Sequence, residues 1–328
     1  MALKPARMNP DSAAQMSFDV PVLLITWRRP DTTRQVIDAI RCVAPSKIYV
    51  ASDGPRTEKE AHKVLATREL IKAAIDWPCE IKTRYSEINQ GCECGVSSAI
   101  TWFFDHEQEG IILEDDCVPH IDFFSYCRDL LNRYRLDRRV FCISGNNFQG
   151  GHWRGESTYY FSRYVHIWGW ACWRDRWSEY KKNAEIWSVL STSHSYQETI
   201  FPDQYELSYW MAIWSKLFGI GVPDTWDYRW SLVCMASNSL SATPNKNLVA
   251  NIGFGEDATH TVDSLSEPIK SYGLDDQVIV HPELIIRDSE ADKYTSFYHY
   301  GIKPPTFKEK AKSFAKKIVT NLLPPTVA

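Results

Sequence analysis

The stretch "GIILEDDCVPHIDFFSYC", residues 110–127, contains the unit from which the first half of the chain is built. Its apolar run at 111–113 is typical of a strand that is buried on both faces. Three acids, at 114–116, follow without a spacer. A segment with aromatic residues and helical periodicity begins at about residue 123. The stretch therefore predicts a strand, an acidic loop and a helix in direct succession.

The same unit repeats on both sides of this stretch. Strands are expected at 20–26, 47–52, 80–85, 110–114 and 140–144, and helices at 31–42, 58–74, 96–106 and 123–135. This alternation predicts a Rossmann-like α/β fold, in which a mostly parallel central sheet carries helices on both faces. Right-handed crossovers would bring the loops "TWRRP", "SDGPR", "INQGCECG" and "EDD" to the carboxyl edge of the sheet, where such folds bind ligands.

We divide the 328 residues into four segments. Residues 1–18 mix Met, Pro, Ala and Ser, and we expect a disordered extension. Residues 19–144 hold the strand–helix alternation. Residues 145–300 form a second half that contains ten of the 13 tryptophans. Residues 301–328 form a basic tail whose amphipathic stretch, 307–323, could lie on an anionic membrane surface or pack on the protein itself.

Composition and charge exclude several classes of protein. The formal net charge is -4, from 41 acidic and 37 basic residues, which does not suggest the basic face of a nucleic-acid-binding protein. No apolar run approaches the ~20 residues of a membrane span, and the first 18 residues do not resemble a signal peptide. The nine cysteines are odd in number and scattered, which argues against a disulfide framework. We therefore expect a cytoplasmic protein without a nucleic-acid partner.

The acids at 114–116, called the acid triplet below, repel one another unless a positive charge lies among them. Hard oxygen ligands select Mg²⁺ or Mn²⁺, which commonly bridge one or two carboxylates to substrate phosphates. The alternative is a solvated turn in which the two aspartates cap the helix that starts near Asp122. The buried strand before the acids and their place at the sheet edge favour a metal site. Neither a G-x-G-x-x-G nor a P-loop motif occurs, so those two phosphate-binding classes are not indicated.

The segment "LEDDCVPHIDFFSYC" resembles the metal and nucleotide-sugar motif of glycosyltransferase-A-fold enzymes, particularly of the N-acetylglucosaminyltransferase I family. "PVLLITWRRPDTTRQVIDAI" and "SDGPR" are similar to the first two nucleotide-contacting loops of that family. Residues 19–300 also resemble bacterial sugar transferases labelled hemolysin-like. The resemblance implies that 19–144 bind the nucleotide sugar, and that 145–300 bind the acceptor and carry catalysis.

The resemblance also implies roles for individual residues. It places the nucleotide-sugar contacts at Thr26, Arg29, Asp53, Glu114, Asp115, Gly169 and Trp170. Of these, Arg29 and Asp53 would contact the base. Glu114 and Asp115 would contact ribose or base, and Asp116 would bind the metal.

Two residues of the second half complete the expected site. Asp227 in "DTWDYRW" resembles the aromatic-flanked acid that serves as general base in this family, and an inverting transfer needs such a base opposite the leaving group. The alternatives are Asp203 or Glu206 as base, or a structural hydrogen bond made by Asp227. His260 in "GFGEDATHT" would join Asp116 as a metal ligand on a loop that closes over the donor, or would be an ordinary surface or core histidine.

These observations predict a metal-dependent glycosyltransferase that uses Mn²⁺ or Mg²⁺. It would move a hexosyl or N-acetylhexosaminyl group, with inversion, from a nucleoside-diphosphate donor to a hydroxyl of a glycan or lipid-linked acceptor. UDP is favoured by the resemblance. A lipid-linked acceptor would suit bacterial polysaccharide biosynthesis, with the enzyme peripheral at the inner face of the membrane.

Two other functions stay open. A sugar nucleotidyltransferase has the same architecture, although "TWRRP" lacks the glycines of its usual triphosphate-binding loop. A non-catalytic glycan-binding protein could keep the sheet and the tryptophans, although it would not need the acid triplet.

Overall fold

A computed structural model describes residues 18–253, 270–275 and 278–304. The expected extension 1–18 meets this part only at Phe18, which is buried. The amphipathic stretch 307–323 and His260 lie outside the described residues. In the part of the chain that is described, no helix combines the length and apolar character needed to cross a membrane.

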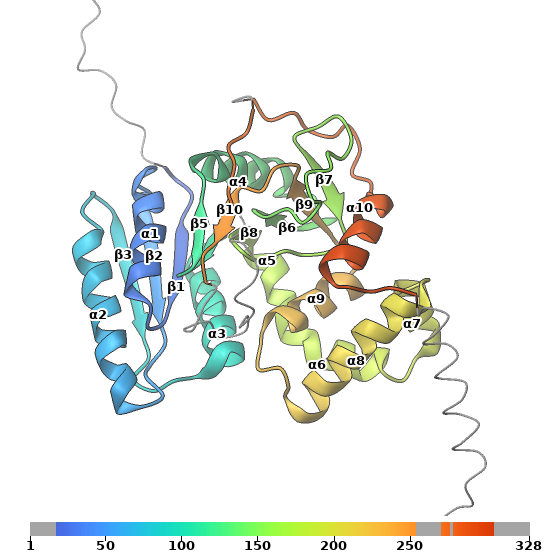
Figure 1. Cartoon of the computed structure of the whole chain (residues 1–328), viewed down its shortest axis with the longest axis horizontal. Helices are drawn as coiled ribbons and strands as arrows, with labels where there is room; N and C mark the ends of the chain where they lie inside the picture. Colours follow the sequence, from blue (N-terminus) through green and yellow to red (C-terminus); the bar gives the residue numbers. More distant parts are fainter. Residues whose placement is uncertain (1–17, 254–269, 276–277, 305–328) are drawn as a thin grey trace, which may run out of the picture.

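One central sheet of eight strands has the order β3-β2-β1-β4-β8-β6-β9-β7 (Figure 1). Its strands are β1 (Val22–Thr26), β2 (Lys47–Ser52), β3 (Glu80–Tyr85), β4 (Glu109–Glu114), β6 (Val140–Ser144), β7 (Tyr159–Ser162), β8 (Trp170–Trp173) and β9 (Leu240–Pro244). Only β8 and β7 run against the other six, since the pairs β4–β8, β6–β8 and β7–β9 are antiparallel and the remaining pairs are parallel. The predicted α/β fold with a mostly parallel sheet is confirmed.

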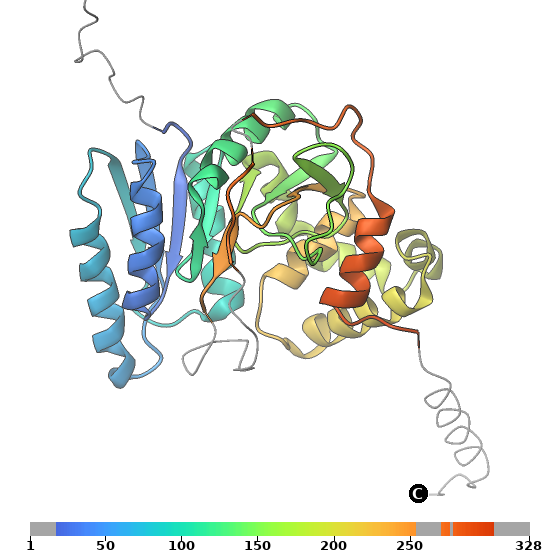
Figure 2. The ribbon, with the colours of Figure 1, turned by 45° about the horizontal axis from the view of Figure 1, so that its top comes forward.

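Helices cover both faces of the sheet. One face carries α1 (Pro30–Arg41), α2 (Glu58–Ala74) and α4 (Ile121–Tyr134), and the other carries α3 (Gly91–His106) and α9 (Asp227–Ala236). Figure 2 shows α1 and α2 side by side along the strands of the first half. The alternation of side chains along β1 explains the two faces, because Val22 and Leu24 pack on the α1 side whereas Leu23 and Ile25 pack on the α3 side.

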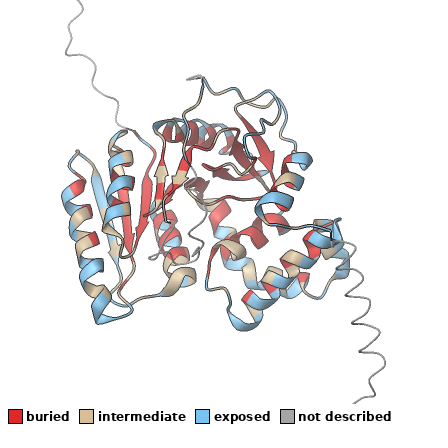
Figure 3. Ribbon diagram, in the orientation of Figure 1, coloured by how far each residue is buried: buried red, intermediate tan, exposed pale blue. Residues whose placement is uncertain are grey.

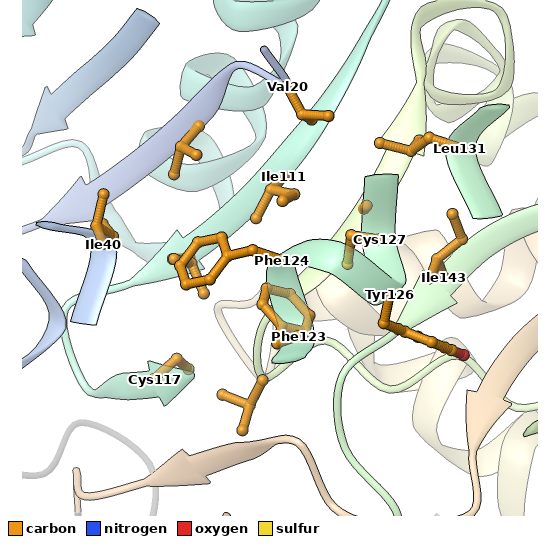
Figure 4. Close-up of a cluster of buried hydrophobic side chains, with 14 of the residues drawn as sticks. Val20, Ile40, Ile111, Cys117, Phe123, Phe124, Tyr126, Cys127, Leu131 and Ile143 are labelled. Atoms are coloured by element: carbon orange, nitrogen blue, oxygen red, sulfur yellow. The ribbon is translucent and has the colours of Figure 1, made fainter. Parts of the chain in front are cut away.

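The helix predicted after the acid triplet is α4, and its aromatic residues are core. Phe123, Phe124 and Tyr126 have no exposed surface and pack in one cluster with Ile111 of β4 and Ile143 of β6 (Figure 4). Burying a large apolar side chain contributes roughly 1.5–3 kcal/mol. The packing therefore fixes both ends of the acidic loop, and so holds the triplet at the sheet edge.

The described strands β6 to β9 of the chain extend the sheet of the first half. Strand β6 lies between β8 and β9, so the expected boundary at residue 144 falls inside one continuous sheet. The helical elements beside it are α5 (Arg174–Trp177), the 3-10 helix η2 (Ser178–Lys182), α6 (Asn183–Leu190), α7 (His194–Ile200) and α8 (Gln204–Ile220). Trp210 and Trp214 of α8 are fully buried in a separate cluster beneath these helices. Figure 3 shows that the buried residues concentrate in the sheet and on the inner faces of the helices.

A short two-stranded ribbon lies beside the main sheet. Strand β5 (Cys117–Pro119) pairs with β10 (Val249–Asn251) in antiparallel register, so that Asn251 lies opposite Cys117. The N–H of Ile252 then donates to the carbonyl of Asp116 at 2.9 Å. The chain returns over the second half through α10 (Ser289–Tyr294) and the π-helix η3 (Thr295–His299). The ribbon brings residues 251–253 next to the acid triplet.

Candidate active site

A cavity of about 540 Å³ opens at the carboxyl ends of β1, β2 and β4. Strands β2 and β3 lie on one side of β1, and the next strand along the chain, β4, lies on the other side. The strand order therefore reverses at β1. Open α/β sheets bind ligands in the crevice that such a reversal leaves. Both halves of the chain form the walls, because Asp53 and Asp227 both line the cavity.

Seven of the predicted site residues line this one cavity. They come from the ends of β1, β2 and β4 and from the start of α9, and they are Thr26, Arg29, Asp53, Glu114, Asp115, Asp116 and Asp227. Parallel strands bring residues that are far apart in sequence to the same edge, as expected for the loops after β1, β2 and β4. Asp227, expected from the resemblance, joins them from the second half.

Arg29 supplies a positive charge inside the acid triplet. Its Nη2 donates to Oδ1 of Asp115 and lies 2.9 Å from Oδ2 of Asp116. Asp115 is 2% exposed and also accepts from the backbone N–H of Trp27 at 3.0 Å. The guanidinium that the resemblance placed at the base therefore pairs with acids. The alternative in which these aspartates cap α4 is wrong, because the side chain of His120 caps that helix.

Glu114 has an unusual protonation equilibrium. Burial, followed by repulsion from Asp116 and Asp115, raises its pKa to about 8, and attraction to Arg29 opposes the shift only in part. Burial and the neighbouring carboxylates thus favour the protonated form of Glu114 in the ligand-free molecule. A protonated carboxyl in the cavity can donate a hydrogen bond to a ligand.

Asp53 organises the cavity wall. Its Oδ1 accepts from the N–H groups of Gly54 at 2.8 Å and Gln90 at 2.9 Å. Its Oδ2 accepts from Nδ2 of Asn89 at 2.9 Å and from the same Gln90 N–H at 3.1 Å. Three protein donors therefore bind the two oxygens of this carboxylate, and the Gln90 N–H is shared between them. Burial raises the pKa of Asp53 while these backbone donors oppose the rise. The base contact implied by the resemblance would have to share the carboxylate with these donors.

Asp227 is the first residue of α9 and faces the cavity from the second half. Its Oδ1 accepts from the hydroxyl of Thr225 and from the backbone N–H of Tyr228, the latter at 2.9 Å. Trp226, beside it, is 2% exposed. The charge of Asp227 also raises the pKa of Glu114, although by less than burial, Asp116 and Asp115 do. The two carboxyl groups therefore share one electrostatic environment.

Asp224, the other acid of "DTWDYRW", has a structural role. Its Oδ2 accepts from the N–H of Cys92 and its Oδ1 from the N–H of Glu93, both at 3.1 Å. These donors belong to the first turn of α3, where the backbone N–H groups otherwise lack helical partners. Asp224 thus caps α3 from the second half, and it leaves Asp227 as the acid of this motif that lines the cavity.

The two alternatives for the general base lie elsewhere. Asp203 is the N-cap of α8, where it accepts from the N–H groups of Tyr205 and Glu206 at 2.8 and 2.9 Å. Glu206 is 8% exposed and is bonded to Tyr164 at 2.8 Å and to Arg163 at 3.3 Å. Neither acid lines the cavity.

Gly169 and Trp170 do not line the cavity, and the preceding residues Ile167 and Trp168 do. Trp170 is 1% exposed, and its ring stacks on Trp226 with centroids 5.7 Å apart. The predicted contact of Trp170 with the donor sugar is therefore corrected, because its indole is part of the core. Gly169 has φ +72° and packs so tightly that a Cβ would lie 2.8 Å from Val249, which explains the glycine without a ligand.

Sequence analysis assigned no role to several cavity residues, among them Arg56, Arg84 and Cys92, although Arg56 and Cys92 belong to loops that it placed at this edge. Arg84 lies at the end of β3, and its Nη1 donates to the hydroxyl of Ser98 at 3.0 Å. It lies within the strand, before the loop that the strand-end rule placed at the edge. Cys92 belongs to the first turn of α3, which begins at Gly91 and not at residue 96 as expected. Burial raises the pKa of the Cys92 thiol to about 12, so it is not a nucleophile at neutral pH.

The donor set was tested for its fit to a divalent cation. Asp116 faces the cavity, and Gly253 packs over it so closely that a Cβ there would lie 2.0 Å from Oδ2. Among the described residues, no three His, Cys, Asp or Glu side chains converge as a preformed site. Mg²⁺ is usually held by one or two carboxylates and completed by substrate phosphates. The hard oxygens of Asp116 fit that mode, which requires no protein cage.

Comparison with known proteins gives no family for this chain: no family model and no curated protein matches it. Among solved structures, it is similar to the mannosyltransferase PcManGT from Pyrobaculum calidifontis, in complex with GDP-Man and Mn²⁺, at 14% identity and TM-score 0.33, with 57% of this chain and 50% of that chain covered. The glycosyltransferase GlyE from Streptococcus pneumoniae has 12% identity and TM-score 0.26 over 70% of this chain and 65% of its own. The 4-diphosphocytidyl-2C-methyl-D-erythritol synthase from Anaerococcus prevotii has 8% identity and TM-score 0.29, with 54% of this chain and 78% of that chain covered. The chain thus spans about half of the mannosyltransferase, and function has to be argued from the site.

Proposed function

We propose that this chain is a glycosyltransferase. It moves a hexosyl or N-acetylhexosaminyl group from a nucleoside-diphosphate donor, with UDP favoured by the resemblance given above, to a hydroxyl of a glycan or lipid-linked acceptor. The observation that carries the proposal is that the acid triplet of the first half and Asp227 of the second half line the same cavity. Glycosyl transfer needs these two functions on opposite sides of the reacting carbon.

The donor side of the cavity is the edge of the sheet. Its volume of about 540 Å³ suits a nucleotide-sized ligand. Asp116, with a divalent cation, would hold the diphosphate, and such a cation would neutralise the negative charge that develops as the diphosphate leaves.

The acceptor side of the cavity is the start of α9. The Thr225 hydroxyl and the Tyr228 N–H hold the carboxylate of Asp227 in a fixed orientation. A fixed carboxylate can accept the proton of the attacking hydroxyl as the new glycosidic bond forms. Attack from the Asp227 side, with the diphosphate leaving on the Asp116 side, would invert the anomeric centre.

The test is transfer itself. Wild-type protein incubated with Mn²⁺, a sugar nucleotide and candidate acceptors should release the nucleoside diphosphate and form a glycoside. We expect Asp227→Asn to lower kcat by at least 100-fold and to leave donor affinity within threefold, because general base catalysis contributes roughly 10²–10⁴ in rate. Asp38→Asn, on the exposed surface of α1, is the matched control and should behave as wild type.

Two results would contradict the proposal. Normal turnover by Asp227→Asn would exclude Asp227 as the base. A protein that releases pyrophosphate from a nucleoside triphosphate and a sugar phosphate, and does not use sugar nucleotides as donors, would be a nucleotidyltransferase instead.

A further inference from the structure

We propose that the second half carries another ligand site, at the opposite edge of the sheet from the first cavity, which binds a single alkyl chain with a carboxylate or phosphate head group. This inference does not rest on the proposed glycosyl transfer. It follows from the lining of a second cavity, which contains none of the site residues predicted from the sequence.

The second cavity has a volume of about 630 Å³ and lies at the far end of α9 from Asp227. Met235 and Ala236, in the last turn of α9, line it together with Leu240 at the start of β9. Strand β9 runs parallel to β6, so its first residue lies at the amino edge of the sheet, whereas the first cavity opens at the carboxyl edge. Helix α9 rises roughly 13 Å from Asp227 to Ala236. The two cavities are therefore separate sites.

Most of the wall of the second cavity is apolar. The apolar side chains come from α6, α7, α9 and β9, and they include Ile186, Val189, Leu190, Ile200, Met235 and Leu240. Val189 is 50% exposed, so the apolar wall continues to the molecular surface. Sites for small molecules are usually cavities of roughly 300–1,000 Å³ with apolar walls and a few polar groups. An alkyl chain in this cavity would remove apolar surface from water, which favours binding.

Two arginines lie close together in this otherwise apolar wall. Arg163 follows β7 directly, and Arg287 pairs with Phe161 of β7 in an isolated parallel bridge. Both arginines line the cavity. Burial lowers the pKa of the Arg163 guanidinium, and nearby acidic groups oppose this shift. The positive charge of Arg287 lowers the same pKa further, so the two guanidinium groups repel each other and an anion between them would relieve that repulsion.

Each arginine already has an acidic partner and keeps donors that the partner does not use. Arg163 donates from Nη1 to Oε2 of Glu206 at 3.3 Å and from Nη2 to the carbonyl of Ile200 at 3.1 Å. Arg287 donates from Nε to Oδ2 of Asp292. Because a guanidinium has five N–H groups, these bonds leave donors on both arginines for the oxygens of a ligand.

The charges that line the cavity favour an acidic head group. Lys182, at the end of η2, adds a third cation, and one acid, Glu185, opposes the three among the described lining residues. Glu185 is exposed, whereas Arg163 is only 6% exposed, so water and salt screen the acid more than they screen the buried cation. Carboxylates and phosphates form charge-assisted hydrogen bonds with guanidinium groups. The head group is therefore expected at Arg163 and Arg287, with the chain along the apolar wall.

The experiment compares three probes by calorimetry at fixed salt. Decanoate carries both the chain and the acid, 1-decanol carries the chain alone, and butanoate carries the acid on a short chain. We expect decanoate to bind at a single saturable site and at least tenfold more tightly than 1-decanol. It should also bind at least 50-fold more tightly than butanoate, because each buried methylene contributes roughly fourfold in affinity.

Matched variants assign the binding to this cavity. Arg287→Met keeps a long side chain and removes the donors, and it should reduce the preference for decanoate over 1-decanol to less than threefold. Arg34→Met, on the exposed face of α1, is its control. Val189→Asp puts a negative charge on the apolar wall and should weaken decanoate binding at least tenfold. Ala184→Asp, on the same helix but not among the described residues that line the cavity, should bind as wild type does.

Thermal unfolding of each variant checks that it is folded. Arg287→Met leaves the buried Asp292 without one of its partners, so Val189→Asp provides a second variant. Val189 and Ala184 are both exposed, and substitutions there carry little risk to the fold.

Three results would overturn the inference. They are equal affinity for decanoate and 1-decanol, wild-type affinity in both Arg287→Met and Val189→Asp, and binding to vesicles of anionic phospholipid without binding of dispersed decanoate. The last result would assign this surface to membrane contact instead. None of the probes is a nucleotide or a sugar, so the outcome is independent of the test of the proposed transferase.

Discussion

Arg29 is the residue on which the acid triplet depends in the ligand-free molecule. Its guanidinium contacts Asp115 and Asp116 from the end of β1, and the side chain of Asp115 is 3% exposed. A buried carboxylate that loses its partner retains its full desolvation penalty. The positive charge of Arg29 therefore offsets part of the repulsion among the carboxyl groups of residues 114–116.

Arg29→Gln should consequently lower the free energy of unfolding by about 3–5 kcal/mol, the usual cost of breaking a buried ion pair from one side. Urea unfolding at pH 7 measures this directly. Adding Asp115→Asn to Arg29→Gln should recover part of the loss, because the orphaned charge is then removed. Arg34→Gln, on the solvent side of α1, is the control. A loss below about 0.5 kcal/mol, typical of surface substitutions, would show that the pair is not structural.

Residue positions could be predicted from the sequence better than residue roles. Thr26, Asp53 and Asp116 follow apolar strands, and parallel topology alone brings them to one edge. The partners of Asp53 and Arg29 lie 37 and 86 residues away, and no local pattern encodes such contacts. The error at Trp170 has a related cause, because neighbouring residues of a strand face opposite sides and the register of β8 is set by distant strands.

At the scale of elements, the first half was predicted closely because its apolar runs and helical periods are strong. The strands at 47–52, 80–85 and 140–144 and the helix at 58–74 have the expected bounds. Helix α3 is the exception, since it begins at Gly91, five residues early. Its first turn is completed by Asp224 of the second half, so its start depends on a contact across 132 residues.

The second half was much less predictable from its sequence. The abundance of tryptophan in this half did not indicate where each side chain lies, and Trp210 and Trp214 of α8 and Trp230 of α9 are fully buried core residues. Strand β8 enters the sheet antiparallel between β4 and β6, which neither alternation nor periodicity indicates. Fully buried strands and helices of this length give similar apolar runs, and only tertiary packing distinguishes them.

At the scale of the whole molecule, the two halves share one sheet and one cavity. Unfolding of the second half would therefore also disrupt the site. His166 of that half is 4% exposed, and burial, followed by the charge of His299, holds its pKa well below 6.5. The folded protein therefore keeps His166 neutral at a pH where the unfolded chain protonates it. Because the unfolded state then binds more protons, the free energy of unfolding falls as pH drops below 6.5.

His166→Gln should remove this contribution. Between pH 6.5 and 5 the wild type should lose up to about 1.4 kcal/mol per pH unit more than the variant, the value for one proton. His62→Gln, at an exposed position of α2, should retain the wild-type slope. Urea unfolding at pH 5, 6 and 7 provides the comparison, and parallel slopes for wild type and His166→Gln would contradict a neutral, buried His166.

The central claim is that the cavity between the two halves holds a nucleoside diphosphate across the carboxyl edge of the sheet. The most direct measurement is a crystal structure of the chain grown with UDP and Mn²⁺. We predict density for the diphosphate beside Asp116, with the base over Ala51 and Ala99. Nucleotide bound at another surface, with the side chains of this cavity unchanged, would contradict the account.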